Sequence, residues 1–527
     1  MSYDQYDNYE FECIESSFYD INNKDIYLSK KYSELRSDVI KFISKSVYYY
    51  WNENKYVWTR TDNFSYLKND ISDVLSRYII NIKNQFYPYY EGMVLSKQQG
   101  RPVDEDKISS YTKQLEKVDK VLENLGSDSK LNAIKNLTPC HLFDENFESN
   151  LNSMATLLPV PMNLVIDLET GELRGREKED MFTFELSTKY IKTIDTSEIE
   201  KIFSDMFLGH EETIRFMQRF LGYCLTGLNT ERKFVILWGP QGKNGKTTLA
   251  NMMNSLLERY FLALDRKTFD SRVTGSGAEP YLLKARGKRC SFMSEPTKEV
   301  DSEKLKSFVG NDEINPRALG KNPDERGFIN ASKLMIAYNN PLNFPNDPAL
   351  FDRIINIPCL ARFVKVKTEE HHIVEDPKLL NRIRQPDFRS KLFKWCIEGC
   401  KEWFKQGLNE PSLIVESTND FKKNSDSVSM FLDQCVDPTA EDPFNTSDDV
   451  HLLYTKWCED NSRTDVLNKD RLCKQIAQLY GTNIRAKNKY DQRGFRLDFK
   501  PTSEWGDKDL PISSNDLLIR TMHKLCR

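Results

Sequence analysis

A short apolar strand that leads through a glycine-rich loop into a helix constrains this chain more than any other feature. Residues 234–238, Phe-Val-Ile-Leu-Trp, are continuously apolar, and residues 249–260 have the pattern of a helix. Between them lies Gly-Pro-Gln-Gly-Lys-Asn-Gly-Lys-Thr-Thr, residues 239–248. Such a loop is typical of a phosphate site, in which backbone N–H groups and the helix N-terminus surround the anion. The alternative, a glycine-rich turn that binds nothing, is disfavoured by Gly-Lys-Thr in this context.

Each part of the loop has an expected role in binding ATP and Mg²⁺. Gly242 and Gly245 allow the backbone to close around the β-phosphate. Lys246 is expected to bridge the β- and γ-phosphates, and the Thr247 hydroxyl to hold Mg²⁺. The first glycine, Gly239, lies one position earlier than in the common G-x-x-x-x-G-K-[ST] pattern, so the loop is one residue longer. The predicted ATP-binding residues are Gly239, Pro240, Gln241, Gly242, Lys243, Asn244, Gly245, Lys246, Thr247 and Thr248.

Two further strands carry candidate catalytic groups at their ends. A phosphate loop occurs in kinases, GTPases, transporters and motors, so residues downstream must distinguish these classes. Residues 289–295 predict a strand that ends in Glu295, either a partner of Mg²⁺ or the base that polarises the attacking water. Residues 333–338 predict another strand, and the amide of Asn339 after it is a candidate sensor that orients this water. Asn340 leaves that assignment open by one position, and Asn and Pro are also common at ordinary strand exits.

Arg353 is the fourth candidate catalytic residue. It lies at the end of Asp-Pro-Ala-Leu-Phe-Asp-Arg, where it is expected to act as an arginine finger on ATP bound to a neighbouring subunit. An isolated monomer should then hydrolyse ATP poorly. A small-molecule kinase would need lid arginines and a substrate pocket instead of Arg353. A nucleic-acid-binding protein with a decayed ATPase would bind equally well without Lys246.

The order of these segments resembles the superfamily 3 helicases of the poxvirus and phage/plasmid primase-helicase type. The resemblance covers about residues 40 to 500. The sequence has Leu164 where that family usually has glycine. The motifs that carry the resemblance are Gly-x-x-Gly-x-Asn-Gly-Lys-Thr-Thr, the strand to Glu295, Lys306-x-x-x-Gly310-x-Asp312-x-Ile314-x-x-Arg317, the strand to Asn339, Arg353, the signature from Asn163 to Glu172 and the collar around Gly222.

Helical spacing before residue 150 predicts a helical N-terminal domain, and C-terminal helices followed by a basic hairpin predict a small α+β module similar to a winged helix. The resemblance implies that these flank an α/β fold, a three-layer P-loop AAA+ ATPase core. It also implies a homo-hexamer that moves 3′ to 5′ on single-stranded or forked DNA, and a virus or mobile element as source. A hairpin between Glu295 and the sensor strand is expected to grip DNA in the ring's channel. Its predicted DNA-binding residues are Lys306, Arg317 and Lys321, with Lys304, Arg326 and Lys333 nearby.

The net charge limits how the chain can bind nucleic acid. Lysine and arginine total 75 against 79 acids, a net charge of −4, which excludes coating of DNA by bulk charge. Cations must therefore be gathered locally, and a ring would bring copies of each one to its axis. A basic hairpin near the C-terminus is a second candidate contact, although docking of a protein is nearly as good an interpretation. Its cations are Arg485, Lys487, Lys489, Arg493 and Arg496.

The chain divides into several expected domains. No acidic metal-binding pattern of a primase precedes Asn163, so priming is expected from a separate primase, or from an N-terminal portion that this sequence lacks, and synthesis from a separate polymerase. The alternative function is a ring-forming ATPase that loads or packages nucleic acid. The expected segments are 1–30, an acidic flexible tail; 31–150, a helical domain; 151–228, a β element and helical collar; 229–370, the ATPase core; 371–440, post-core helices; and 441–527, the winged-helix-like module.

The sequence also predicts where the protein resides. The 11 cysteines include no Cys-x-x-Cys pair, and Cys396 and Cys400 lack the further ligands that a zinc site needs, so reduced buried thiols are expected. The sequence contains no run of 18 apolar residues and no signal-peptide pattern. We therefore expect no membrane contact and no secretion, and a location at a cytoplasmic viral replication site or in the host nucleus.

Overall fold

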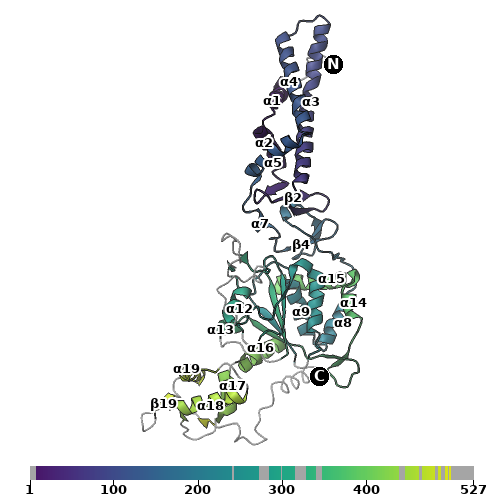
Figure 1. The fold of residues 1–527 in the computed structure, drawn as a ribbon. Helices are drawn as coiled ribbons and strands as arrows, with labels where there is room; N and C mark the ends of the chain where they lie inside the picture. Colours follow the sequence, from purple (N-terminus) through teal and green to yellow (C-terminus); the bar gives the residue numbers. More distant parts are fainter. Residues whose placement is uncertain are drawn as a thin grey trace. The chain divides into compact units, whose positions relative to one another are not determined.

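The structure, a computed structural model, forms two compact units (Figure 1). The first comprises Met1–Ser153 with Gly175–Glu185, and the second comprises Met154–Arg174 with Leu186–Arg527. The boundary therefore crosses the segment 151–228 that the sequence predicted as one element. The structure describes residues 8–239, 242–271, 284–297, 300–311, 313–314, 328–339, 347–425, 427–437, 445–461, 466–480, 485–487, 493–495 and 498–499.

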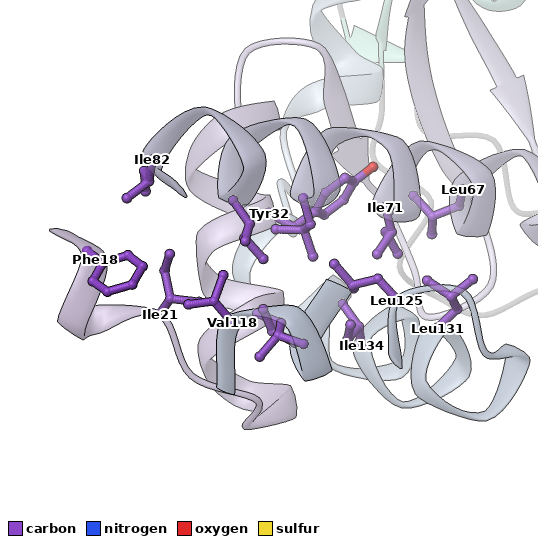
Figure 2. Close-up of a cluster of buried hydrophobic side chains, with 14 of the residues drawn as sticks. Phe18, Ile21, Tyr32, Leu67, Ile71, Ile82, Val118, Leu125, Leu131 and Ile134 are labelled. Carbon is purple, nitrogen blue, oxygen red and sulfur yellow. The ribbon is translucent and has the colours of Figure 1, made fainter. Parts of the chain in front are cut away.

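The first unit is built on helices, as predicted. Its apolar core gathers side chains from six of them, among these side chains Phe18, Ile71, Val118 and Ile134 (Figure 2). The expected flexible tail is wrong from residue 8 onward, because Phe18 is fully buried and stacks on Phe86 at a centroid distance of 3.9 Å. The helices are α1 (Asn8–Asp20), α2 (Asp25–Arg36), α3 (Phe64–Gln98), α4 (Glu105–Asn124), α5 (Asp128–Leu137), α6 (Pro139–Leu142) and α7 (Phe147–Asn150).

A three-stranded antiparallel sheet interrupts these helices. It joins β1 (Ile40–Phe42), β2 (Tyr48–Asn52) and β3 (Val57–Thr61) in that order. Over residues 31–86, apolar residues at helical spacing are separated by aromatic runs at 48–51 and 56–58, which predicts helix, hairpin, helix. The hairpin is confirmed as β2 and β3. The helix predicted around Val39 to Val47 is wrong, since Ile40 and Phe42 point inward on either side of Lys41, a period of two. The short apolar run at β1 fits both the helical and the strand periodicity, and pairing with β2 makes it a strand.

The second unit begins with the segment that carries the predicted signature. The apolar run over residues 157–168, followed by Glu-Thr-Gly-Glu, predicts one strand that runs into a turn. The structure instead forms a hairpin of β4 (Leu157–Val160) and β5 (Leu164–Asp167). Met162 and Asn163 turn the chain with φ values of 71° and 59°. The collar helices are confirmed as α8 (Ser197–Met206) and α9 (Glu211–Tyr223). The short strand β6 (Leu173–Gly175) ends at the boundary between the two units. The 3-10 turn Lys178–Asp180 belongs to the first unit and the 3-10 turn Glu258–Tyr260 to the second.

A parallel five-stranded sheet forms the centre of the second unit. Its order is β13-β7-β12-β9-β8, and every neighbouring pair is parallel. The three strands predicted from apolar runs are confirmed as β7, β9 and β12. Continuous apolar runs suit this sheet because helices cover both faces. The strands are β7 (Phe234–Trp238), β8 (Phe261–Leu264), β9 (Cys290–Ser294), β12 (Lys333–Tyr338) and β13 (Ile354–Pro358).

Helices pack on both faces of this sheet, α9 and α15 on one side and α12 and α13 on the other (Figure 1). Phe234 and Ile236 share a buried cluster with Leu305 and Phe308 of α12. Next to β13, the backbone N–H of Asn356 donates to Thr418 Oγ1 of α16 at 2.9 Å. The helices are α10 (Lys246–Leu257), α12 (Ser302–Val309), α13 (Pro348–Phe351), α14 (Leu379–Ile383), α15 (Pro386–Gln406) and α16 (Ser412–Ser425).

The C-terminal helices and hairpin are confirmed where the structure describes them. A buried apolar cluster that includes Trp457 and Phe495 holds them together. In the described part of the chain, no helix has both the length and the apolar character needed to cross a bilayer. The elements are α17 (Ser427–Cys435), β16 (Val436–Asp437), β17 (Asn445–Thr446), α18 (Ser447–Asp460), α19 (Lys469–Tyr480), β18 (Arg485–Lys487), β19 (Arg493–Phe495) and β20 (Asp498–Phe499), with β17, β19 and β18 forming one sheet in that order.

Candidate nucleotide-binding site

Three of the predicted site segments meet at one edge of the parallel sheet. The glycine-rich loop follows the carboxyl end of β7, Glu295 follows β9, and Asn339 follows β12. Because β12 pairs in parallel with both β7 and β9, these three strand ends lie side by side. In open α/β sheets ligands bind in the crevice outside the carboxyl ends of the strands. The sheet therefore presents the predicted residues where such a fold places its ligand.

The loop closes through left-handed backbone conformations. Gly242 and Gly245 have φ values of 69° and 83°, which glycine adopts without steric cost. Lys243 has a φ of 54°, a conformation that strains a residue with a Cβ. Helix α10 begins directly after the loop, at Lys246. The N–H groups of its first turn have no intrahelical partners and point toward the loop. The predicted contacts Pro240 and Gln241 lie outside the described residues.

The side chain of Asn244 anchors the glycine-rich loop to the segment after β13, a role that the loop motif alone did not reveal. The side chain is 4% exposed, and its Nδ2 donates to the carbonyl of Ala361 at 3.0 Å. The N–H of Phe363 donates to the carbonyl of Lys243 at 2.9 Å, a second tie to the segment after β13. A Cβ at Gly239 would lie 2.6 Å from Asn244 Oδ1, so only glycine fits there. The asparagine inside the loop was the available sequence signal, but its acceptor lies 117 residues away.

Lys246 is a buried cation held by neutral oxygens. Its side chain is mostly inside the protein, with 7% of the residue exposed, and burial lowers its pKa. Nζ donates to Asn339 Oδ1 at 2.7 Å, to Asn244 Oδ1 at 2.9 Å and to the carbonyl of Gly239 at 3.3 Å. These three acceptors carry no formal charge. A phosphate oxygen would supply the missing anion, so the residues present fit a nucleotide phosphate.

Asn339 connects this lysine to the predicted carboxylate. While Oδ1 accepts from Lys246, Nδ2 donates to Glu295 Oε1 at 2.7 Å. Glu295 is exposed and has a φ of 48°, a strained conformation of the kind found at functional sites. The structure thus brings together Lys246, Asn339 and Glu295, and Asn340 lies outside the described residues. Thr247, exposed in the first turn of α10, adds a hydroxyl, and hydroxyl and carboxylate oxygens are ligands that suit Mg²⁺.

Arg353 lies at the opposite edge of the sheet. It directly precedes β13, whose first residue pairs with Phe234 at the start of β7. Five strand residues separate this level from the glycine-rich loop after Trp238, a span of roughly 16 Å at ~3.3 Å per residue. Nη1 of Arg353 donates to the backbone carbonyl of Lys306. The guanidinium is therefore not placed to contact a nucleotide in the loop of its own chain.

The predicted DNA-binding lysine has other contacts in this chain. Lys306 Nζ lies 2.7 Å from Glu303 and 2.8 Å from Asp347, and its side chain is 18% exposed. It links α12 to Asp347, which caps the N-terminus of α13. A DNA contact by Lys306 stays a prediction, and its observed geometry is that of an internal ion pair. Arg317 and Lys321 lie outside the described residues.

Lys333, predicted to lie behind the channel hairpin, is buried in the core, so that prediction is wrong. It is 1% exposed and begins β12. Nζ donates to the carbonyls of Ala331 at 2.9 Å and Leu228 at 3.1 Å, and also to that of Thr226. Burial lowers the pKa of Lys333 to about 7. These three backbone carbonyl oxygens, two of them from the end of the collar segment, solvate the amine in place of water, so it is not a surface cation.

The segment around these sites does contain the base of a hairpin. β10 (Glu313–Ile314) pairs antiparallel with β11 (Phe328–Ile329). This pairing lies between β9 and β12 in the chain, as predicted for a projecting hairpin. The residues between the two strands lie outside the described part of the chain.

Comparisons with known proteins were made with both sequence and structure. The family described as D5 N terminal like matches residues 26–208, and the family described as Poxvirus D5 protein-like matches residues 423–503. The chain is 25% identical over 412 residues to a putative helicase of Acanthamoeba polyphaga mimivirus, covering 74% of this chain and 40% of that protein. It is 25% identical over 304 residues to the putative helicase 022R of Frog virus 3 (isolate Goorha), covering 54% of this chain and 30% of that protein.

The chain thus spans less than half the length of these curated relatives. Among solved structures, two apo structures of the NrS-1 C-terminal region align with TM-scores of 0.40. They are 11% and 12% identical and cover 60% and 64% of this chain, and 80% and 84% of their own.

Fold and site define a mixed α/β protein whose parallel sheet carries a glycine-rich loop, a buried lysine and a carboxylate at one edge. More particularly, the two family matches and the viral relatives named as helicases make the chain similar to the poxvirus D5-type superfamily 3 helicases.

Proposed function

We propose that this protein is an ATP-dependent replicative DNA helicase that moves single-stranded DNA through a homo-hexameric ring. The observation that carries the proposal is the hydrogen-bonded chain from Lys246 through Asn339 to Glu295. Viral relatives named as putative helicases support it, since they share 25% of their aligned residues with this chain. A three-layer AAA+ core is consistent with a parallel sheet that helices cover on both faces.

Within one subunit, each of these side chains has a distinct task. Lys246 holds the β- and γ-phosphates, so its bonds to neutral oxygens are exchanged for a bond to an anion. Asn339 then directs its amide at the attacking water, and Glu295 polarises that water. Thr247 and Glu295 would hold Mg²⁺, which when bound neutralises charge on the phosphates. The Asn339 amide thereby couples Lys246 to Glu295.

Completion of the site requires a second copy of the chain. Arg353 lies at the sheet edge opposite its own loop, so a head-to-tail interface is needed to bring it to a nucleotide. There its guanidinium would stabilise charge that develops on the transferred phosphoryl group. Head-to-tail interfaces generate closed rings when the rotation closes, which fits a hexamer.

DNA is proposed to contact the hairpin based on β10 and β11 and the C-terminal module. Arg317 and Lys321 lie between those two strands in the sequence, and a ring gathers six copies of such cations despite the net charge of −4. The C-terminal module runs α17, β16, β17, α18, α19, the hairpin of β18 and β19, and β20, and its helix pair followed by a hairpin is similar to a winged helix. Arg493 on that hairpin is exposed and is a candidate phosphate contact.

A separate primase and polymerase are the proposed partners at the fork. The alternative function, a ring ATPase that loads or packages nucleic acid, would use the same nucleotide site. The two differ in outcome, since a loader hydrolyses ATP without separating strands.

A strand-displacement assay with Asn339→Ala tests the proposed function. With ATP and Mg²⁺, the wild-type protein should displace one strand of a forked DNA duplex. Asn339→Ala removes the amide between Lys246 and Glu295, so hydrolysis and displacement should fall about 100-fold while ATP binding changes little. Hydrolysis by the wild-type protein without displacement would favour the loader. If Asn339→Ala hydrolysed ATP at the wild-type rate, Asn339 would have no role in the mechanism.

A further inference from the structure

A cluster of metal-ligating side chains lies outside the nucleotide site. It is formed by Glu369, His371 and His372, which lead into β15 (His372–Val374). β15 pairs in parallel with β14 (Arg362–Val364), the strand that follows the core sheet. The spacing Glu-x-His-His places three potential ligands within four residues. The proposed function assigns no role to any of them.

The ligand atoms are already close to the separations that a bound metal requires. His371 Nδ1 lies 3.4 Å from Glu369 Oε2, and His372 Nε2 lies 4.0 Å from Glu369 Oε1. All the ligand atoms are within 4.8 Å of one another. Tetrahedral ligands at ~2.1 Å from zinc are roughly 3.4 Å apart, so one pair matches and the others need shifts of about 1 Å. A side-chain rotation achieves such a shift without movement of the backbone.

His372 gives the second, independent indication of a ligand. Its side chain is 5% exposed, and its buried Nε2 has no hydrogen-bond partner among the described residues. A buried polar atom without a partner is costly, and it is rare in native structures. The other ring nitrogen, Nδ1, lies 3.0 Å from Thr368 Oγ1 and accepts from the Thr368 backbone N–H at 3.4 Å. Metal binding at Nε2 would place the ring proton on Nδ1, which would then donate to the Thr368 hydroxyl instead of accepting from the N–H, the arrangement of a metal-binding histidine.

We propose that Glu369, His371 and His372 bind one divalent transition-metal ion of the zinc class. Two imidazoles and one carboxylate suit zinc or cobalt, whereas Mg²⁺ and Ca²⁺ take oxygen ligands. Three protein ligands leave a position for water. The ion would fasten the loop between β14 and β15. The backbone N–H of Phe363, in the middle of β14, donates to the carbonyl of Lys243 in the glycine-rich loop. A bound metal would therefore make one anchor of that loop more rigid.

Cobalt binding to the metal-free full chain, purified without a histidine tag, tests this proposal. Titration with Co²⁺ should show about one tight site per chain, with d–d absorption bands of nitrogen and oxygen ligands and no thiolate charge-transfer band. Zn²⁺ should displace the Co²⁺. Glu369→Gln, an exposed change that leaves the fold intact, should weaken Co²⁺ binding at least tenfold, as should His371→Ala.

Glu370→Gln is the matched control, since it removes the same charge from the adjacent position and should change the affinity less than about twofold. His372→Gln should abolish binding, and circular dichroism of this buried variant reports whether it has folded. The proposal is overturned if the wild-type chain binds no stoichiometric Co²⁺. It is also overturned if a thiolate band appears, or if Glu369→Gln and His371→Ala bind Co²⁺ as tightly as the wild type.

Discussion

Lys246→Ala is expected to reduce ATP hydrolysis about 1000-fold or more while leaving the protein folded. In the proposed function the Lys246 ammonium binds the phosphates, and it does so where water is largely excluded. Without nucleotide the buried cation contributes little to stability, because burial disfavours its charged form and lowers its pKa. The melting temperature should therefore stay within about 4 °C of the wild type. Steady-state phosphate release and differential scanning calorimetry measure the two effects.

Lys201→Ala is the matched control for this variant. Lys201 is a lysine of α8 with 76% of its side chain exposed, in an i,i+4 pair with Asp205. Its loss should change the hydrolysis rate less than about twofold, since exposed helix pairs contribute little. A Lys246→Ala protein that is folded and hydrolyses ATP at more than about a tenth of the wild-type rate would contradict the assignment of the loop.

Gly222→Ala is expected to destabilise the second unit by about 3 kcal/mol or more. A Cβ at Gly222 would lie 2.1 Å from the backbone nitrogen of Cys400 and 2.5 Å from the carbonyl carbon of Gly399. Gly399 in turn would place a Cβ 2.0 Å from the carbonyl oxygen of Gln218. The backbones of α9 and α15 thus touch through two glycines, and no flexible side chain can move aside. The helices must separate, which breaks packing along their length. Urea denaturation measures the loss.

Gly92→Ala provides a control of opposite sign. Gly92 lies inside α3, and a Cβ there meets nothing within 4 Å. Alanine should stabilise that helix by about 0.5–1 kcal/mol, because glycine has the larger backbone entropy to lose. If Gly222→Ala unfolded at the urea concentration of the wild type, the close approach of α9 and α15 would be wrong.

The central strands were predictable from sequence because each signal is local. β7, β9 and β12 are continuous apolar runs bounded by turn residues, and a parallel sheet covered on both faces requires such runs. Glu295 and Asn339 could be assigned for the same reason, since each directly follows a buried strand. That Asn339 bridges Lys246 and Glu295, however, could be seen only from the two hydrogen bonds in the structure.

Features that depend on distant partners could not be predicted. α1 looked like an acidic tail, because Phe18 packs on a ring 68 positions later in the chain. Lys333 looked like any surface lysine at a strand start, and carbonyls more than 100 positions away bury it. The apolar residues of β1 fit a helix and a strand equally well, and antiparallel pairing with β2 makes the segment a strand. In each case tertiary contacts outweighed the local pattern.

The most direct test of the central claim is the ATP hydrolysis rate of rings assembled from two variants. Lys246→Ala and Arg353→Ala should each be nearly inactive alone. Co-expressed in equal amounts, they should recover about a quarter of the wild-type rate, because roughly one interface in four joins an intact loop to an intact arginine. A mixture as inactive as its components, or Arg353→Ala alone at the wild-type rate, would show that no neighbouring subunit completes the site.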